Sequence, residues 1–559
     1  MVEQYLQSAA PDAEQIEVTV PEHAQFGHFS TSVAMKLAKE RKQSPMTVAQ
    51  EIAGRLPVIA PEGFFAKIEA VAPGFINMWI APVAIQQAFK EIAAAGDAWG
   101  RPAEKLPETE VVVVDYSAPN IAKPMSVGHL RSTIIGQALY NVFKFCGYTV
   151  IGDNHLGDWG KQFGVLIAAY KEDGSPEEVT IDYLVKLYVG YSARMKEDSR
   201  LGDAARAEVK KLQDGDAENR AIWKKFYDIS LEEFRKMYDM LGVSFDQYLG
   251  ESFYNDQLEG IVRDALDRHI AIESEGAIVI PVEGEKVPMI IRKSDGAYLY
   301  PTTDIATIKH RIAQWKADLI LYVVGNEQAL HFEQLFKAVH KLGIVTSESL
   351  FHVRFGLMLG EDMKKFSTRA GKTVSLLELL QEAIARARKV VDEKQPDLSE
   401  EERQKIAEVV GIGAVKYNDL SQNRQSDIVF NWERMLSFEG NSGPYLQYAY
   451  ARLKSILRKG DHVSTFDVAH LNDETELQVI MRLQEFPEVI EIITKQYYPH
   501  HLADYLYALA KDVNAMYQKV PVLKADEAER NARLALIATA AQTLKTGLEL
   551  LGLNTLEQM

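Results

Sequence analysis

The chain has 559 residues, of which 47% are hydrophobic and 25% are charged, and this composition is typical of a folded protein with several domains. Its 79 acidic and 62 basic residues leave a formal net charge of −17, which argues against indiscriminate binding to nucleic acids or anionic membranes but allows a specific RNA partner. The single cysteine, Cys146, excludes an internal disulfide and a cysteine-rich metal site.

The sequence lacks the signals that direct a chain into or across a membrane. Its first residues show no basic segment followed by an apolar run, and no stretch approaches the ~20 apolar residues that span a bilayer. Cys146 lies in an apolar helical stretch, where we expect buried filler rather than a catalytic thiol. These features predict a cytoplasmic protein without a membrane partner.

The first segment, residues 1–107, is predicted to be an α+β domain. It combines a strand-like run at 16–20 with helical patterns at 33–39 and 48–56. Residues 93–110 are rich in alanine, glycine, proline and charge, a composition typical of a linker. We therefore place the first domain boundary at about residue 107.

Residues 108–404 are predicted to form a Rossmann-like α/β domain. Val111–Val114 is a short β-branched run typical of a parallel strand buried on both faces, and a helix at 128–146 followed by a strand at 148–151 completes a βαβ unit. The charged residues 171–275 are predicted to be a mainly helical insertion. The remaining elements expected in this domain are strands at 277–282, 287–292, 319–324 and 351–359, and a helix at 376–391 with Ser375 and Glu378 as its capping box.

Residues 405–559 are predicted to be an all-helical domain. From about residue 406 onward the sequence shows only helical patterns. In the last helix six apolar residues follow one another at alternating three- and four-residue steps, which is a helix-packing stripe. They are Leu534, Ile537, Ala541, Leu544, Leu548 and Leu551.

The loop and helix start at 117–136 carry the strongest chemical signal. A junction between a buried strand and a helix presents backbone N–H groups and the positive end of the helix, and both suit a phosphate group. Gly128 leaves room for close approach of a ligand, His129 can donate to a phosphate, and Lys123 adds a cation. From the residues alone, an ordinary βα loop of an α/β domain stays an open alternative.

Ser126-Val127-Gly128-His129 resembles the His-x-Gly-His element of class I aminoacyl-tRNA synthetases, and the flanking residues 117–125 and 130–136 are similar to arginyl-tRNA synthetases in particular. Ser126 stands where that family usually has histidine, and a serine can donate a hydrogen bond but cannot carry a positive charge. The resemblance implies that Ser126, Gly128 and His129 bind ATP and that His129 is catalytic.

A second element, Lys365-Phe366-Ser367-Thr368-Arg369, resembles the lysine-containing loop of the same class. Thr368 stands where the class pattern has a second lysine, and the resemblance implies that Lys123 replaces it. Lys123 and Lys365 are thus implied to be catalytic, and Lys365, Ser367 and Arg369 to bind ATP. Without the resemblance, a solvated basic surface turn is the alternative.

An arginine pocket should offer carboxylates, because a guanidinium group has five donors and a permanent charge. Asp115 ends the valine strand, and Asp304 follows Tyr300 by about one helical turn. The resemblance implies that these three residues, with Asn120 and Gln328, bind arginine. The structural alternative is that Asp115 caps a strand end and Asp304 caps a helix.

The remaining matches concern the border of the active site and the tRNA. Residues 155–160, HLGDWG, resemble a stretch beside the family's active site; His155 and Asp158 alone are too few ligands for a metal, and we expect no metal site in the protein. Aromatic residues stack unpaired bases and cations meet phosphates, although an amphipathic helix explains the same pattern. The residues implied to contact tRNA are Phe26, Tyr445, Tyr448, Arg452, Tyr517 and Met559.

Together these features are identified as those of an arginyl-tRNA synthetase. The resemblance implies an α/β Rossmann-like class I catalytic domain with a helical insertion, an α+β N-terminal domain and an all-α C-terminal anticodon-binding domain. It implies ligation of L-arginine to tRNA(Arg) through an adenylate, with ATP and Mg²⁺ as cofactors, and we expect a monomer. A tRNA-binding paralogue with impaired catalysis is the alternative, and Ser126 is the feature that favours it.

Overall fold

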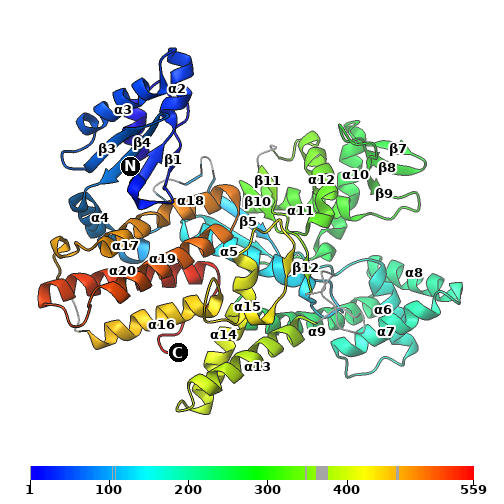
Figure 1. The fold of residues 1–559 in the computed structure, drawn as a ribbon. Helices are drawn as coiled ribbons and strands as arrows, with labels where there is room; N and C mark the ends of the chain where they lie inside the picture. Colours follow the sequence, from blue (N-terminus) through cyan, green and yellow to red (C-terminus); the bar gives the residue numbers. More distant parts are fainter. Residues whose placement is uncertain (1, 103–104, 107–108, 346–348, 361–374, 461–464) are drawn as a thin grey trace. The chain divides into compact units, whose positions relative to one another are not determined.

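The chain forms two compact units, which a computed structural model describes over residues 2–102, 105–106, 109–345, 349–360, 375–460 and 465–559 (Figure 1). The first unit contains Met1–Trp99, Leu453–Phe486 and Ala508–Leu544. The second contains Gly100–Arg452, Pro487–Tyr507 and Lys545–Met559. Each unit is therefore assembled from segments that lie far apart in the sequence.

The first unit begins with an antiparallel sheet in the order β1-β2-β4-β3. Leu37, Val48, Ile52 and Leu56 are buried on the helices that pack with it, and the indole of Trp99 donates to the Leu483 carbonyl at 2.8 Å. The strands are β1 (Val18–Thr19), β2 (Phe29–Thr31), β3 (Phe65–Val71) and β4 (Phe75–Ile80), and the helices are α1 (Val2–Ala9), α2 (Val33–Arg41), α3 (Pro45–Ile59) and α4 (Pro82–Ala95).

The centre of the second unit is a four-stranded parallel sheet in the order β11-β10-β5-β6. Its strands are β5 (Val111–Asp115), β6 (Thr149–Asp153), β10 (Leu319–Tyr322) and β11 (Leu350–His352). Val112, Val113 and Val114 are fully buried, as the β-branched run predicts. Helix α5 (Val127–Phe145) follows β5, and Gly147, with φ +85°, comes directly after it, so the predicted βαβ unit is confirmed.

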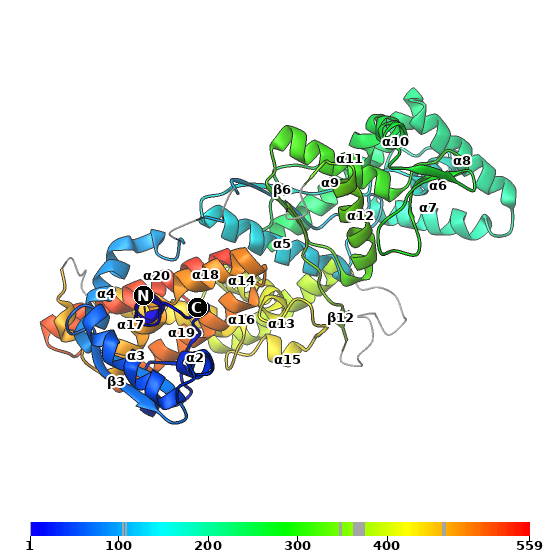
Figure 2. The same ribbon diagram turned by 90° about the horizontal axis from the view of Figure 1, so that it is seen from above.

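A largely helical region lies between β6 and β10. Helices α6, α7 and α8 lie close together in both views of the ribbon (Figures 1 and 2), and β7, β8 and β9 form a small antiparallel sheet. The elements are α6 (Lys161–Glu172), α7 (Ile181–Arg194), α8 (Ser199–Gln213), α9 (Ala217–Leu241), α10 (Leu258–Asp267), β7 (Ile272–Ser274), β8 (Ala277–Ile280) and β9 (Met289–Arg292). Helices α11 (Tyr300–Trp315) and α12 (Ala329–Lys341) then flank β10 in sequence.

The later residues are mainly helical, with one exception to the predicted pattern. The prediction of only helices after residue 406 is wrong, because β13 (Ile428–Val429) pairs in parallel with β12 (Met358–Leu359). The predicted strand at 351–359 is likewise two short strands in two sheets, β11 and β12. The capping box of Ser375 and Glu378 is present at the start of α13 (Leu376–Lys394), which packs against α14 (Glu400–Leu420).

The last helices run through both units. They are α15 (Trp432–Met435), α16 (Gly443–Lys459), α17 (Glu474–Gln484), α18 (Phe486–Gln496), α19 (His500–Lys519) and α20 (Glu527–Leu550). The six apolar residues of the predicted stripe are buried, which confirms the packing face of the last helix. An α+β beginning, a parallel α/β sheet interrupted by helices, and a helical end confirm the predicted fold class.

Candidate active site

The carboxyl ends of the parallel strands meet at one edge of the sheet. The strand register places Asp115 opposite Tyr322 and Asp153, and Tyr322 opposite His352. In open α/β sheets ligands bind in the crevice outside these ends. The loops that leave this edge therefore supply the residues of a candidate site.

Asp115 is buried at this edge and already holds a guanidinium group. Arg311 Nη2, in α11, donates to Asp115 Oδ2 at 2.6 Å and to Asp153 Oδ2 at 2.6 Å, and its Nε donates to Asp153 Oδ2 at 3.2 Å. The Arg311 side chain is fully buried. Arg311 thus faces two carboxyl groups, and burial raises the pKa of Asp153. Asp115 ends its strand, as expected, but its carboxyl group is already paired with Arg311 of the same chain.

The loop after β5 has an unusual backbone. Ser117, Ala118 and Ala122 have φ values of +72°, +45° and +61°, in the left-handed region that residues other than glycine rarely adopt. Such conformations persist only when the surroundings enforce them, and they cluster at functional sites. The loop turns into α5 at Ser126, the residue that caps the helix. Gly128 is exposed in the first turn, and a Cβ there would meet only the Ser126 hydroxyl, at 3.4 Å.

His129 is held in one tautomer by the residue that replaces the family's usual histidine. The Ser126 backbone N–H donates to His129 Nδ1 at 3.0 Å, and the Ser126 hydroxyl lies 3.1 Å from the same nitrogen. The proton of a neutral ring is then on Nε2. Burial lowers the pKa of His129, and the positive charge of Lys123 acts in the same direction. His129 is thus a neutral donor at pH 7.

Lys123 is exposed in the loop, with its ammonium 5.5 Å from the centre of the Tyr188 ring of α7. A cation over an aromatic face is weakly attracted, by about 0.5–1 kcal/mol at an exposed site. The second predicted ATP element, with Lys365, Ser367 and Arg369, lies outside the described residues. The described chain stops at Gly360, just after β12, and resumes at Ser375, just before α13.

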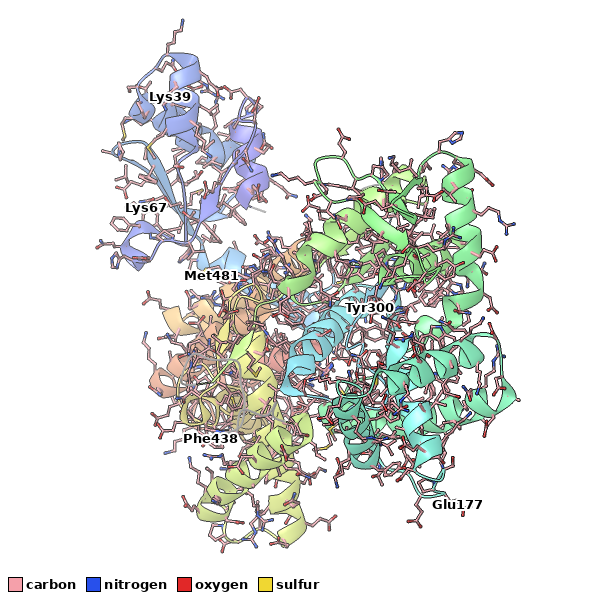
Figure 3. The ribbon with its side chains drawn as sticks, turned by 90° about the vertical axis from the view of Figure 1, so that its right-hand side faces the viewer. Lys39, Lys67, Glu177, Tyr300, Phe438 and Met481 are labelled. Carbon is pink, nitrogen blue, oxygen red and sulfur yellow. The ribbon has the colours of Figure 1, made fainter. Side chains whose placement is uncertain are left out.

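Acidic and aromatic residues gather at the start of α11. Asp304, the fifth residue of this helix and not its cap, places Oδ2 2.7 Å from His331 Nε2 of α12. Tyr300, the first residue of α11, is 68% exposed and is labelled in Figure 3. Partial desolvation, with the charges of Glu251 and Asp304, raises the pKa of Tyr300 even though the residue is largely exposed. Tyr300 and Asp304 are therefore brought together as the sequence predicts.

Glu251 was not anticipated from the sequence. It is half-buried at the start of a 3₁₀ helix, Glu251–Gln257. Burial, together with the charges of Asp158 and Asp304, raises the pKa of Glu251 to about 8. We use the name acidic pocket for Glu251, Tyr300 and Asp304, because the charge of Asp304 raises the pKa values of the other two. A carboxyl group that burial and like charges push toward its neutral form is a candidate partner for a cation.

The HLGDWG stretch explains how Glu251 is placed. Asp158 Oδ1 accepts from the Ser252 N–H at 2.8 Å, and Asp158 Oδ2 accepts from the Ser252 hydroxyl at 2.6 Å. A Cβ on Gly250 would lie 2.4 Å from the Asp158 carboxylate, so a glycine is needed beside it. Asp158 is therefore an anchor for the segment that carries Glu251. The one available signal was Gly250-Glu251-Ser252 at the end of the insertion.

Asn120 and Gln328 are both exposed near this edge of the sheet. The side-chain oxygen of Asn120 packs against Gly157, where a Cβ would lie 2.1 Å from it, and the Ile121 N–H donates to the Gly157 carbonyl. Gln328 ends a 3₁₀ turn, Asn326–Gln328, directly before α12. Both residues are thus exposed to solvent, and the Asn120 side chain is seated against Gly157.

Two of the predicted tRNA-binding residues line one cavity in the second unit. Tyr448, which is 46% exposed, and Met559 line a cavity of about 740 Å³ together with Phe438 and Lys394. The Lys394 ammonium lies 4.6 Å from the Phe438 ring, and Phe438 is labelled in Figure 3. The Gln395 side chain donates to the Met559 carbonyl at 3.2 Å. Aromatic rings beside a cation suit an unstacked base.

The other predicted tRNA-binding residues lie elsewhere. Tyr445 packs edge-on against Tyr507, with ring centres 5.6 Å apart. Arg452 is the last residue of its segment in the second unit. Phe26, 42% exposed, and Tyr517 both belong to the first unit.

Three further features concern metal binding, thiol reactivity and membrane insertion. Among the described residues, no three His, Cys, Asp or Glu side chains are arranged to hold a metal ion. Burial raises the pKa of the half-buried Cys146 thiol to about 12, so it stays a neutral, poor nucleophile. No helix in the described part of the chain is long and apolar enough to span a bilayer.

Comparison with known proteins covers nearly the whole chain. Three family models match: the arginyl tRNA synthetase N terminal domain over residues 1–80, the class I (R) tRNA synthetase catalytic domain over 97–432, and the DALR anticodon binding domain over 446–559. The arginine–tRNA ligase of Fusobacterium nucleatum is 41% identical over 557 residues, which are 97% of this chain and 95% of the relative. That of Shigella sonnei is 42% identical over 552 residues, which are 96% and 94%.

Solved structures agree with these sequence matches. The crystal structure of arginyl-tRNA synthetase from Plasmodium falciparum matches with a TM-score of 0.85 at 29% identity and covers 100% of this chain and 97% of its own. The Thermus thermophilus arginyl-tRNA synthetase matches with a TM-score of 0.84 at 26% identity, over 100% and 99%.

Proposed function

Because the chain belongs to the arginyl-tRNA synthetases, a family of class I enzymes, we propose that it joins L-arginine to tRNA(Arg) in two ATP-dependent steps. The carboxylate of arginine attacks the α-phosphorus of ATP, expels pyrophosphate and forms arginyl-adenylate. A terminal ribose hydroxyl of the tRNA then attacks the carbonyl carbon of the adenylate and releases AMP. Neither step needs a covalent bond to the enzyme, so positioning and charge stabilisation do the catalytic work.

The ATP phosphates bind at the start of α5 in this proposal. His129 donates its Nε2 proton to a phosphate oxygen, because Nδ1 already accepts from Ser126. Gly128 allows close approach, Lys123 leaves Tyr188 to meet the phosphates, and the N–H groups of the helix end add their dipoles. Lys365, Ser367 and Arg369, which lie outside the described residues, are proposed to bind ATP as well.

The acidic pocket receives the arginine side chain. This assignment carries the proposal, because Glu251 and Asp304 place two carboxyl groups near each other, and burial with like charges already drives Glu251 toward its neutral form. A guanidinium group would satisfy both, and the Tyr300 hydroxyl can accept from it. Asn120 and Gln328 can hold the backbone groups of arginine. Asp115 contributes charge from beneath, but Arg311 already takes one of its oxygens.

The tRNA contacts are proposed by analogy of residue type with the family. Tyr448 and Met559, with Phe438 beside them, form a wall for an anticodon base. Tyr445 and Arg452 of the second unit and Phe26 and Tyr517 of the first are proposed as separate tRNA contacts. Mg²⁺ is proposed to arrive with ATP and to be held by its phosphates and water, with few protein ligands. We propose a cytoplasmic monomer.

The retained geometry at His129 favours an active enzyme over the impaired paralogue, because the replacement by Ser126 leaves a donor imidazole in place. Pyrophosphate exchange with each amino acid, with and without tRNA, tests the proposal. We expect exchange with arginine when tRNA is present, and none of comparable efficiency with lysine or glutamine. Charging of another amino acid at a similar efficiency would contradict the assignment.

A further inference from the structure

The strained loop before α5 is held from outside, by helix α9 of the insertion. The Tyr238 hydroxyl lies 2.9 Å from the Ser117 hydroxyl, and the Ser230 hydroxyl accepts from the Ala122 N–H at 2.9 Å. Ser117 and Ala122 are two of the three loop residues with positive φ. The two hydroxyl groups of α9 therefore meet the loop at its two strained turns.

Both contacts are directional and buried. Tyr238 is 2% exposed and Ser230 is 0% exposed. The Tyr238 hydroxyl accepts from Asn154 Nδ2 at 2.9 Å, so its own proton is available to Ser117. The Ser230 hydroxyl donates to the Phe226 carbonyl at 2.7 Å, which leaves its lone pairs toward Ala122. Each hydroxyl is thus oriented by a second partner before it reaches the loop.

Elsewhere α9 stands away from the loop. A cavity of about 440 Å³ lies between Pro124 and Met125 of the loop and Ile229, Phe234 and Met237 of α9. Close packing over this stretch does not fix the loop against the helix. The Ser230 and Tyr238 hydroxyl groups therefore hold the loop together with two residues of α5: the Ser117 N–H donates to the Ser132 hydroxyl at 2.9 Å, and the Thr133 hydroxyl lies 2.9 Å from the Ser117 hydroxyl.

We propose that Ser230 and Tyr238 are positioning residues for the ATP-dependent activation of arginine, because they hold the strained loop that presents Lys123 and the start of α5. This inference rests on the ATP site proposed above. The helical insertion is, on this view, a support of the nucleotide loop as well as a connection between the two halves of the sheet. Without the two hydroxyl groups, the loop relaxes toward ordinary backbone angles and Lys123 loses its place.

The test compares Tyr238→Phe and Ser230→Ala with the parent in the full-length chain, by tRNA-dependent pyrophosphate exchange. We expect each variant to lower kcat/KM for ATP by about five- to fifty-fold, on the scale of one or two lost buried hydrogen bonds, while the KM for arginine changes less than twofold. Tyr191→Phe is the control, since Tyr191 is a buried tyrosine of the same insertion whose hydroxyl donates to the Leu201 carbonyl within it. Ser230→Thr keeps the hydroxyl and should retain activity.

A double variant separates this inference from the proposed ATP site. If the hydroxyl groups act through Lys123, the losses in Lys123→Ala and Tyr238→Phe are not additive when combined. If Lys123→Ala is silent while Tyr238→Phe lowers kcat/KM for ATP, the assigned role of Lys123 fails and the support of the loop stands. If both α9 variants keep ATP parameters within twofold of the parent, or lose ATP and arginine use equally with a lower Tm, the inference is overturned.

Discussion

The two halves of the active site are built on different physical grounds. The nucleotide loop, residues 117–129, owes its shape to left-handed backbone turns and to hydrogen bonds between neutral groups, and its histidine is neutral. The acidic pocket of Glu251, Tyr300 and Asp304 owes its character to carboxyl groups held close together. The loop should therefore respond to changes of geometry, and the pocket to changes of charge and pH.

Removing charge from the pocket should have the largest effect. Asp304→Asn keeps the shape of the side chain but removes a carboxylate that Nε2 of His331 already holds in place. Truncating one partner of a buried charge pair costs roughly 2–5 kcal/mol, so we expect kcat/KM for arginine to fall about 30- to 5,000-fold while the KM for ATP is little changed. Steady-state exchange with each substrate varied separately measures this.

Asp264→Asn is the matched control, because Asp264 is an exposed carboxylate of α10 that pairs with Arg268 on the surface. It should leave both substrates unaffected. If arginine use survived Asp304→Asn in both kinetic and binding measurements, the guanidinium site would lie elsewhere and the contrast between the two halves would be lost.

Removing the donor from the loop should rank next. His129→Ala deletes the Nε2–H that the Ser126 N–H leaves free for the phosphates. Loss of one preorganised donor to a developing charge costs about 10²-fold in rate. Single-turnover adenylate formation should fall by about that factor, with little change in arginine affinity. His340→Ala, at an exposed position in α12, controls for the loss of an imidazole.

Arginine binding should depend on pH through Glu251. The pKa of Glu251 is raised to about 8 in the free protein, and a bound guanidinium, which stays charged throughout, favours the ionised carboxylate. Below pH 8 binding must therefore release a proton, and affinity should fall by up to about tenfold for each pH unit below that value. Calorimetry in two buffers of different ionisation enthalpy should find close to one proton released per arginine at pH 7.

The stability of the free protein should change with pH in the direction opposite to the affinity for arginine. The pKa of Glu251 is higher in the folded protein than its usual value, so the unfolded chain gives up the proton first as pH rises and the free protein loses stability up to about pH 8. Glu251→Gln removes this loss of stability, because a glutamine side chain does not ionise. We expect it to raise Tm at pH 7–8 without arginine, to abolish the pH dependence of binding and to weaken arginine. Unchanged proton release in this variant would assign the proton to another group.

The sequence predicts the elements whose signal is local. The valine run, the glycine after α5 and the capping box of Ser375 and Glu378 each carry their structure within a few residues, and the structure confirms them. Strand β13 was missed because two residues show no periodicity. It pairs with β12, and the Asp427 carboxylate accepts from the Leu357 N–H at 2.7 Å beside it, which only the folded chain brings together.

The candidate site shows the same limit. Tyr300 and Asp304 stand one helical turn apart and were predicted as a pair. Glu251 becomes a pocket residue only through burial and the approach of Asp158 and Asp304 from other segments. Similarly, nothing local to Asp115 reveals that Arg311, from a distant helix, already neutralises one of its oxygens. Sequence motifs predict which residues belong to the site, whereas packing in the folded chain determines the charge that each of them carries.

The smallest effect should come from Ser126, which stands where the resemblance leads us to expect a histidine. Its backbone N–H, which every residue but proline carries, fixes the tautomer of His129, so Ser126→Ala should keep the Nε2 donor. The variant loses the hydroxyl 3.1 Å from Nδ1, a contact worth about 1 kcal/mol, and we expect exchange to fall by about fivefold or less. Ser126→His gives up the preferred cap but adds an imidazole beside the phosphates, and it should keep or raise the rate.

The comparison is tRNA-dependent exchange at saturating arginine for both variants and His129→Ala. If His129→Ala were nearly silent while Ser126→Ala abolished exchange, the roles in this loop would be reversed: the hydroxyl would be the working donor, and geometry would no longer explain how the chain tolerates serine there.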